Sequence, residues 1–175
     1  KENYEMLPVG RLREPLHNLK RAKYVVISRS NLATSSELEF TRTMLTQNGI
    51  KKEHIIEATT EVKALKRLCR GGVGSDTAPA PITAPDPVPG AKVFLFSGIG
   101  NPDSFERLIA KNYQVCGAKV FRDHHTFTSD DLKNVWSAAR AVKADFIFTT
   151  EKDAVKLKSL LQPDDCAIFS VEIDS

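Results

Sequence analysis

The sequence predicts an α/β protein with a mostly parallel sheet flanked by helices, arranged as two small lobes. Three observations support this prediction. Short apolar runs rich in β-branched and aromatic residues alternate with amphipathic stretches of helical period. A stretch rich in proline and glycine interrupts this pattern near the middle of the chain. The 175 residues, 41% hydrophobic and 27% charged, are enough to bury a core without disulfides.

The interruption divides the chain into three parts. Residues 71–90 hold five of the nine prolines and four of the nine glycines, so neither a helix nor a central strand is tolerated there. We therefore expect a first lobe over residues 1–70, a linker or insertion over 71–90, and a C-terminal α/β lobe over 91–175.

The first lobe follows the order strand, helix, strand, which is typical of a βαβ unit. The apolar run Tyr24–Ser28 is typical of a strand that is buried on both faces. The following helix is expected to start at a serine cap and to stop at Asn48-Gly49. The expected elements are a short helix from Pro15, strands over Tyr24–Ser28 and His54–Ala58, a helix over 36–47 capped by Ser35 or Ser36, and a weak helix over 61–69.

The second lobe repeats this alternation more clearly. A glycine turn leads to Asn101 and Pro102, which suit the cap and the first position of a helix. Thr128 and Asp131 have the spacing of a capping arrangement. The expected elements are strands over Val93–Phe96, Ala118–Phe121, Asp145–Thr150 and Cys166–Val171, with helices from Pro102, from Thr128 to about Lys143, and from Thr150 to Asp153 onward.

Composition and motifs exclude several classes of protein. The longest apolar run falls well short of the roughly 20 residues that cross a bilayer. The three cysteines are odd in number and have no metal-ligand spacing, so we expect them to be reduced. We also expect no metal site in this chain, because His17 and His54 have no spacing that marks them as ligands. Although the net charge is +3, the sequence has no ribonucleoprotein motif and no zinc finger, so no nucleic-acid partner is expected.

Asp123-His124-His125 is the strongest candidate for chemistry. It follows a predicted strand, and open α/β sheets bind ligands beyond the carboxyl ends of their strands. An imidazole titrates near neutral pH, and a neighbouring carboxylate orients it and stabilises its cation. A plainer alternative stays open, in which this is a polar turn with one histidine capping the backbone and the other exposed.

Three further segments carry groups that suit a phosphate or a nucleotide. Arg13 offers a fork of donors, and Glu14 offers a carboxylate that accepts hydrogen bonds from ribose hydroxyls or an amine. The glycine turn at 97–101 and the segment 149–153, with Lys152, each lead into a helix. On spacing alone, ordinary helix starts are the simpler interpretation, because the turn lacks the third glycine of a dinucleotide fingerprint and the lysine of a P-loop.

Four motifs are spread along the chain in a fixed order. They are Leu7-Pro-Val-Gly-Arg-Leu-Arg-Glu-Pro15, Phe96-Ser-Gly-Ile-Gly-Asn-Pro102, Phe121-Arg-Asp-His-His125 and Thr149-Thr-Glu-Lys-Asp-Ala-Val-Lys-Leu157. In this order they closely resemble the C-terminal part of the tetraacyldisaccharide 4′-kinase family, the lipid A 4′-kinases of Gram-negative envelopes. The resemblance covers nearly the whole chain and lapses over 71–90, which looks like an insertion.

The resemblance implies a P-loop kinase-like fold and a magnesium-dependent enzyme. Members of this family transfer the γ-phosphate of ATP to the 4′-hydroxyl of tetraacyldisaccharide 1-phosphate, peripherally at the cytoplasmic face of the inner membrane. It implies that His124, paired with Asp123, is catalytic, and that Arg13 and Glu14 lie by the nucleotide. Residues 1–70 would form the C-terminal part of the nucleotide-binding lobe. The implied partners are ATP, the lipid A disaccharide precursor and, through the full-length protein, an anionic membrane surface.

The chain departs from the family pattern in one respect. The Walker A loop, the magnesium-binding acids and the catalytic aspartate of the family precede the segment seen here. We therefore expect a C-terminal fragment without turnover of its own, with ATP and Mg²⁺ bound mainly by the absent segment. Two alternatives remain: a metal-dependent phosphoesterase of the Asp-His-His type, which needs further strand-end aspartates, and a non-catalytic nucleotide- or anion-binding module.

Overall fold

Two compact units make up the chain. The computed structural model describes residues 12–68, 86–161 and 167–174. The first unit ends at Thr60, and the second runs from Glu61 to Asp174. This division lies before the boundary expected after residue 70, because residues 61–67 belong to the sheet of the second unit. The expected linker over 71–90 lies mostly outside the described residues.

The N-terminal unit is a βαβ unit, as the sequence predicts. Strands β1 (Val25–Ile27) and β2 (Ile55–Glu57) pair in parallel, and helix α1 (Ser35–Gln47) connects them. The helix expected from Pro15 is a short 3₁₀ helix. The 3₁₀ helices of this unit are η1 (Leu16–Arg21), η2 (Ser30–Leu32) and η3 (Lys52–His54).

Two expectations for this unit are wrong. The cap of α1 is Thr34 and not Ser35 or Ser36. The Thr34 hydroxyl accepts a hydrogen bond from the Glu37 N–H at 3.2 Å, and the Glu37 carboxylate accepts one from the Thr34 N–H at 2.6 Å. A capping box needs this three-residue spacing to a glutamate, which decides the choice between neighbouring hydroxyls. Strand β1 is also not buried on both faces by the described residues, since Val26 is 58% exposed.

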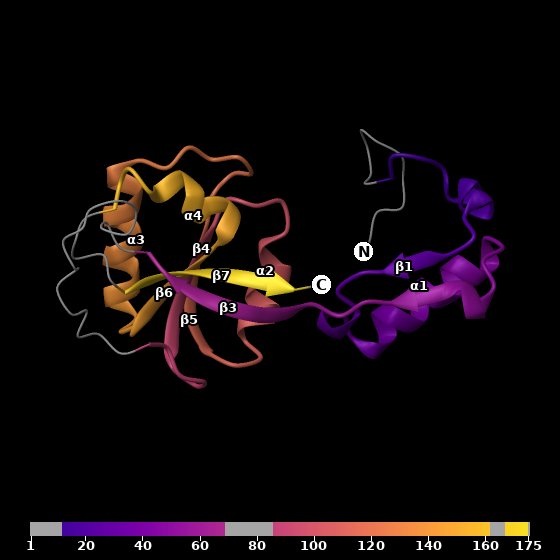
Figure 1. The fold of residues 1–175 in the computed structure, drawn as a ribbon, viewed down its shortest axis with the longest axis horizontal. Coiled ribbons are helices and arrows are strands. Elements are labelled where there is room, and N and C mark those ends of the chain that lie inside the picture. Colours follow the sequence, from indigo (N-terminus) through magenta and orange to yellow (C-terminus); the bar gives the residue numbers. More distant parts are fainter. Residues whose placement is uncertain (1–11, 69–85, 162–166, 175) are drawn as a thin grey trace, which may run out of the picture. The chain divides into compact units, whose positions relative to one another are not determined.

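The C-terminal unit is a five-stranded sheet flanked by helices (Figure 1), which confirms the predicted α/β class. The strand order is β3-β7-β6-β4-β5, and all neighbouring pairs are parallel except β3 with β7. The strands are β3 (Glu61–Arg67), β4 (Lys92–Ser97), β5 (Gln114–Val120), β6 (Phe146–Thr150) and β7 (Ile168–Asp174). The helices are α2 (Pro102–Ile109), α3 (Ser129–Ala141) and α4 (Glu151–Leu157).

Side-chain caps start these three helices at the positions that the sequence predicts. Asn101 caps α2 directly before Pro102, and Thr150 caps α4. Thr128 caps α3 and forms both bonds of a capping box with Asp131. Because α2 and α4 start just after β4 and β6, their first residues lie beside the carboxyl ends of those strands.

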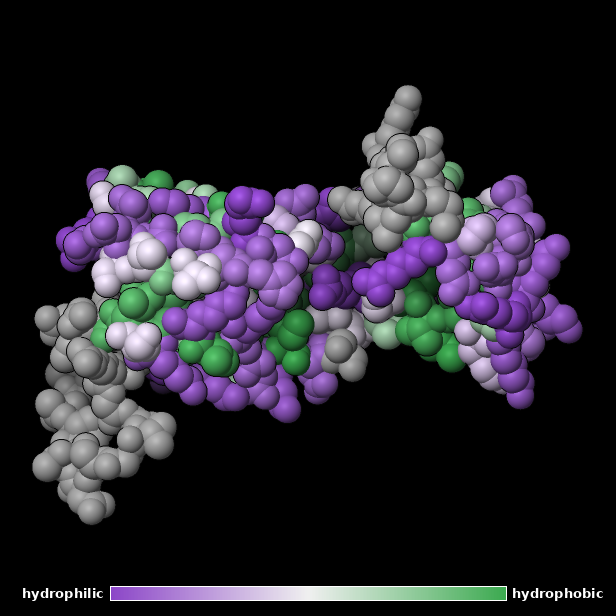
Figure 2. All heavy atoms as spheres, turned by 90° about the horizontal axis from the view of Figure 1, so that it is seen from above, coloured by the Kyte–Doolittle hydropathy of each residue, from purple (hydrophilic) through white to green (hydrophobic). Residues whose placement is uncertain are grey.

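Alternating residues of the sheet bury two apolar clusters, one on each face. One cluster includes residues of α3 and α4, and the other includes residues of α2. Neighbouring residues of β4 divide between them: Phe94 and Phe96 join the first cluster, and Val93 and Leu95 join the second. Both faces of this mostly parallel sheet are therefore covered. Outside, the face seen in Figure 2 is mostly hydrophilic, with smaller hydrophobic patches.

Strand β3 shows that the weak helix predicted over 61–69 is wrong. Val62 and Leu65 both pack against the cluster beside α2, and their spacing of three is typical of a helix face. A bulge between Val62 and Ala64 interrupts the pairing of β3 with β7. It shifts the alternation of side chains by one residue, so both apolar residues fall on one face of a strand.

Candidate active site

Three segments predicted to carry chemistry meet at one edge of the sheet. Strands β5, β4 and β6 are parallel neighbours, so their carboxyl ends lie together. The segments are 97–101 after β4, 121–125 after β5 and 149–153 at the end of β6. They are joined directly, because the Phe121 N–H donates to the Ser97 carbonyl at 2.8 Å and the Gly98 N–H donates to the Asp153 carboxylate at 2.8 Å.

Asp123 links two of these segments. Its Oδ1 accepts hydrogen bonds from the His124 N–H at 2.9 Å and from the Lys152 ammonium at 3.1 Å. The hydrogen bond from Lys152 lowers the pKa of the Asp123 carboxyl, and the charge of His124 acts in the same direction. The carboxylate is therefore ionised at neutral pH and lies beside a fixed positive charge.

His124 combines an uncommon backbone conformation with an exposed ring. Its φ is 62°, in the left-handed region, which costs an L residue about 1–2 kcal/mol. The side chain is 77% exposed, and Nε2 lies 3.8 Å from Asp123 Oδ2. The structure thus brings the two predicted catalytic residues together, with the imidazole accessible to a ligand from solvent.

His125 lies in a different environment from its neighbour His124. Its Nε2 lies 3.0 Å from Asp131 Oδ2, and its ring stacks on Phe121 and meets Phe127 edge-on. The hydrogen bond with His125 lowers the pKa of Asp131. Of the adjacent histidines, one therefore anchors the turn and the other projects from it. The spacing of His125 and Asp131 gives no sign of this contact, which forms across the turn.

Asp153 is a residue of this site that sequence reasoning identified only as part of a helix start. Its carboxylate is fully buried and accepts hydrogen bonds from the Gly98 N–H, the Thr150 hydroxyl at 2.9 Å and the Lys156 ammonium at 3.0 Å. Asp153 is followed by the apolar residues Ala154 and Val155 in the first turns of a helix, and a carboxylate that is buried there needs hydrogen-bond partners. This pattern can be read from the sequence, but it does not indicate which segment supplies the partners.

Arg13 and Glu14 belong to the N-terminal unit, whereas Asp123 and His124 belong to the C-terminal unit. The side chains of Arg13 and Glu14 are exposed. Oε2 of Glu14 accepts hydrogen bonds from Arg21 at 2.6 Å and from Asn18 at 3.2 Å, and Arg21 lowers the pKa of this carboxyl. Glu14 is therefore an ionised acceptor held at the start of η1.

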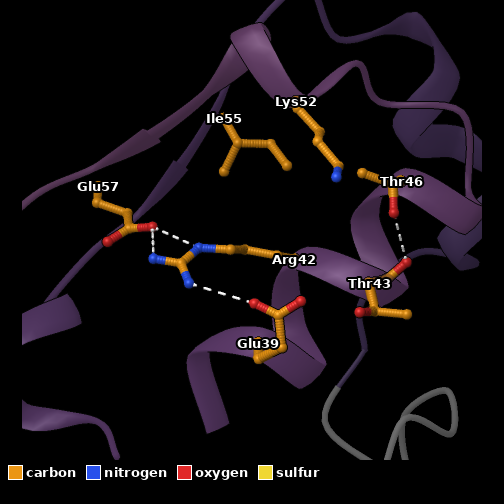
Figure 3. A pocket seen from close by; sticks show the side chains of 7 residues that line it. All are labelled: Glu39, Arg42, Thr43, Thr46, Lys52, Ile55 and Glu57. Carbon is orange, nitrogen blue, oxygen red and sulfur yellow. Dashed lines mark hydrogen bonds and ion pairs between the residues drawn. The ribbon is translucent and has the colours of Figure 1, made fainter. Parts of the chain in front are cut away.

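A separate hollow of about 350 Å³ lies between α1 and the segment from η3 to β2 (Figure 3). The Arg42 guanidinium extends into it. Its Nε donates to the carboxylate of Glu57 at 2.7 Å, and its Nη1 donates to the carboxylate of Glu39 at 3.5 Å. The hydrogen bond with Glu57 raises the pKa of Arg42. These two acids offset the charges of Arg42 and Lys52, and the candidate catalytic and nucleotide-binding residues do not line the hollow. We assign it no part in the site.

The structure describes residues 12–68, 86–161 and 167–174, and these ranges hold neither a metal cluster nor a membrane span. Within these ranges, no three His, Cys, Asp or Glu side chains lie close enough together to share a metal ion. Within the same ranges, no helix has the length and apolar character needed to cross a bilayer. Cys116 is a free, partly buried thiol.

Comparison with known proteins identifies the family. Residues 1–175 match the family described as Tetraacyldisaccharide-1-P 4'-kinase. Two relatives are named Tetraacyldisaccharide 4'-kinase. The one from Bdellovibrio bacteriovorus is 34% identical, and the match covers 98% of this chain and 47% of the relative. The one from Halothermothrix orenii is 36% identical, and the match covers 86% of this chain and 39% of the relative.

A crystal structure of the "apo" form of LpxK from Aquifex aeolicus in complex with ATP is also similar. It has 23% identity and a TM-score of 0.45, and the match covers 97% of this chain and 42% of that one. The chain thus spans less than half the length of these relatives. It belongs to the tetraacyldisaccharide-1-P 4'-kinase family.

Proposed function

We propose that this chain is the C-terminal part of a lipid kinase. The full-length protein transfers the γ-phosphate of ATP to the 4′-hydroxyl of tetraacyldisaccharide 1-phosphate, in lipid A biosynthesis. The observation that carries this proposal is the family match over the whole chain, supported by relatives that are named for this reaction. The N-terminal unit then belongs to the nucleotide-binding lobe, and residues 91–175 form most of the C-terminal lobe.

His124 is proposed to accept the proton of the 4′-hydroxyl as that oxygen attacks the γ-phosphorus and ADP leaves. Its exposed ring and the ionised Asp123, 3.8 Å away, support this role. The carboxylate stabilises the imidazolium that forms when the ring takes the proton. Lys152, at 3.1 Å from Asp123, holds the carboxylate and adds positive charge beside the site of phosphoryl transfer.

Arg13 and Glu14 are proposed to contact the nucleotide. The exposed guanidinium of Arg13 suits a bidentate contact with a phosphate. Glu14 is ionised, and both of its described hydrogen bonds use Oε2. Its Oε1 is therefore suited to accept a hydrogen bond from a ribose hydroxyl or from the adenine amine.

Magnesium is implied by the family, but the described residues do not fit it. Two aspartates near this edge of the sheet are each paired with a lysine, Asp123 with Lys152 and Asp153, in the first turn of α4, with Lys156. No cluster of three suitable ligands occurs in the described part of the chain. We propose that Mg²⁺ and most contacts to ATP are supplied by the rest of the full-length protein, and that the 175 residues alone do not turn over.

The location proposed for the full-length protein is the cytoplasmic face of the inner membrane, where it binds peripherally to an anionic surface. This proposal rests on the family and on its acylated substrate.

The role of His124 is tested by replacing it with alanine in the full-length protein. Initial rates with labelled ATP and the disaccharide should show kcat lowered by about 10²–10⁴-fold, with the KM for ATP nearly unchanged, because a base acts chiefly in the transition state. His54→Ala is the matched control, since that histidine lies in the other unit and packs on Tyr24. An unchanged kcat in His124→Ala removes His124 from the mechanism.

A further inference from the structure

Asp153 is the only charged side chain that is buried among the described residues, and the proposed reaction gives it no role. A buried carboxylate is unfavourable unless its charge and its lone pairs are satisfied. Here the partners come from two strand ends. Gly98 follows β4 and donates its N–H at 2.8 Å, while Thr150 ends β6 and donates its hydroxyl at 2.9 Å. The carboxylate therefore ties two loops of the site together.

This tie reaches the turn that carries His124 through Gly98. A methyl group at Gly98 would lie 3.2 Å from the carbonyl oxygen of Arg122, 3.4 Å from Cβ of His125 and 3.4 Å from Oδ1 of Asp153. Gly98 thus packs closely against the carboxylate of Asp153 and against Arg122 and His125, which lie on either side of the Asp123-His124 pair. A shift of the Gly98 backbone towards the turn would therefore crowd Arg122 and His125.

A second route runs through Lys156, which binds Asp153 Oδ1 at 3.0 Å. Its ammonium lies 5.7 Å from the centre of the Phe127 ring. Phe127 in turn meets the His125 ring edge-on, with centroids 5.1 Å apart. Both routes therefore end at His125, the anchored neighbour of His124.

We propose that Asp153 is a positioning residue for phosphoryl transfer. By holding Gly98 and Lys156, it fixes the turn that presents His124 to the substrate hydroxyl. This proposal rests on the proposed function, in which His124 is the proton acceptor. A carboxylate that served only to hold the Thr150 cap of α4 would stabilise the helix without changing the environment of the His124 ring.

The test uses Asp153→Asn in the full-length protein, a substitution that keeps the size of the side chain and removes its charge. With histidine ring carbons labelled, NMR should show the His124 and His125 resonances displaced. Initial rates should show kcat lowered at least tenfold, with the KM for ATP within about twofold, because a displaced base affects the transition state most. Thr34→Ala, which removes the cap of α1 in the other unit, should change neither readout.

Gly98→Ala gives a second perturbation that leaves the carboxylate in place, and it should displace the same resonances. In variants that melt cooperatively, unmoved His124 resonances would overturn the proposal. Displaced His124 resonances with an unchanged kcat would show that Asp153 has no positioning role in the reaction. Failure of the proposed function is distinct: His124→Ala would then keep its kcat, whatever the resonances of Asp153→Asn do.

Discussion

Replacing His124 with glycine should make the chain more stable than replacing it with alanine. At a φ of 62° an L residue costs about 1–2 kcal/mol, and glycine avoids this cost. Glycine loses about 0.5–1 kcal/mol more backbone entropy on folding. The midpoints of these ranges leave His124→Gly ahead by about 0.7 kcal/mol, or about 2 °C in Tm for a chain of this length.

Thermal unfolding followed by circular dichroism measures this difference in stability. Because both variants lack the imidazole, the comparison reports on the backbone alone and requires no activity assay. The matched control is Lys133, an exposed position inside α3. There glycine should be less stable than alanine by about 1 kcal/mol, the opposite sign, because the backbone is helical. If His124→Gly melts below His124→Ala, the turn does not hold the strain that we assign to it.

Three further predictions follow from the C-terminal unit. In the folded chain the pKa of Asp131 is lowered, chiefly by its hydrogen bond with His125, so its stabilising contribution is present above the unfolded pKa of about 3.9 and is lost as the pH falls through the folded value. The gap in Tm between the parent and Asp131→Asn should therefore narrow between pH 6 and pH 3, and a constant gap would contradict this account. Lys152→Met removes the hydrogen bond that contributes most to the low pKa of Asp123, so a carboxyl-carbon NMR titration should show that pKa rise. An unchanged titration would mean that Lys152 does not lower the pKa of Asp123. Phe148→Ala empties a fully buried site in β6 and should cost about 3–5 kcal/mol in urea unfolding, while a loss under about 1 kcal/mol would mean that the sheet core is not packed as described.

Local signals in the sequence predict the parts of the fold that depend on local chemistry. The caps at Asn101, Thr128 and Thr150 are correct because a side-chain oxygen and a nearby N–H decide where each helix starts. The parallel sheet is correct because its strands are apolar on both faces, and the strand ends then place the Asp123 and Lys152 segments at one edge.

The predictions that are wrong or incomplete concern features that depend on residues far apart in the sequence. In β3 the bulge at Val62 makes the apolar spacing look helical, and only pairing with β7 reveals a strand. The role of Asp153 depends on Gly98, 55 positions earlier in the chain, so no local pattern marks it. The contact between His125 and Asp131 also depends on how the turn packs against Phe121 and Phe127, which spacing does not encode.

We propose above that the full-length protein carrying this chain phosphorylates the 4′-hydroxyl of a lipid A disaccharide. The most direct measurement is ³¹P NMR of tetraacyldisaccharide 1-phosphate incubated with ATP, Mg²⁺ and the purified full-length protein. If the protein is this kinase, the spectrum gains a phosphate monoester resonance at the 4′ position, and ADP forms in a one-to-one ratio with it. ATP that remains intact, or that is hydrolysed to free phosphate with the disaccharide unchanged, would contradict the proposal.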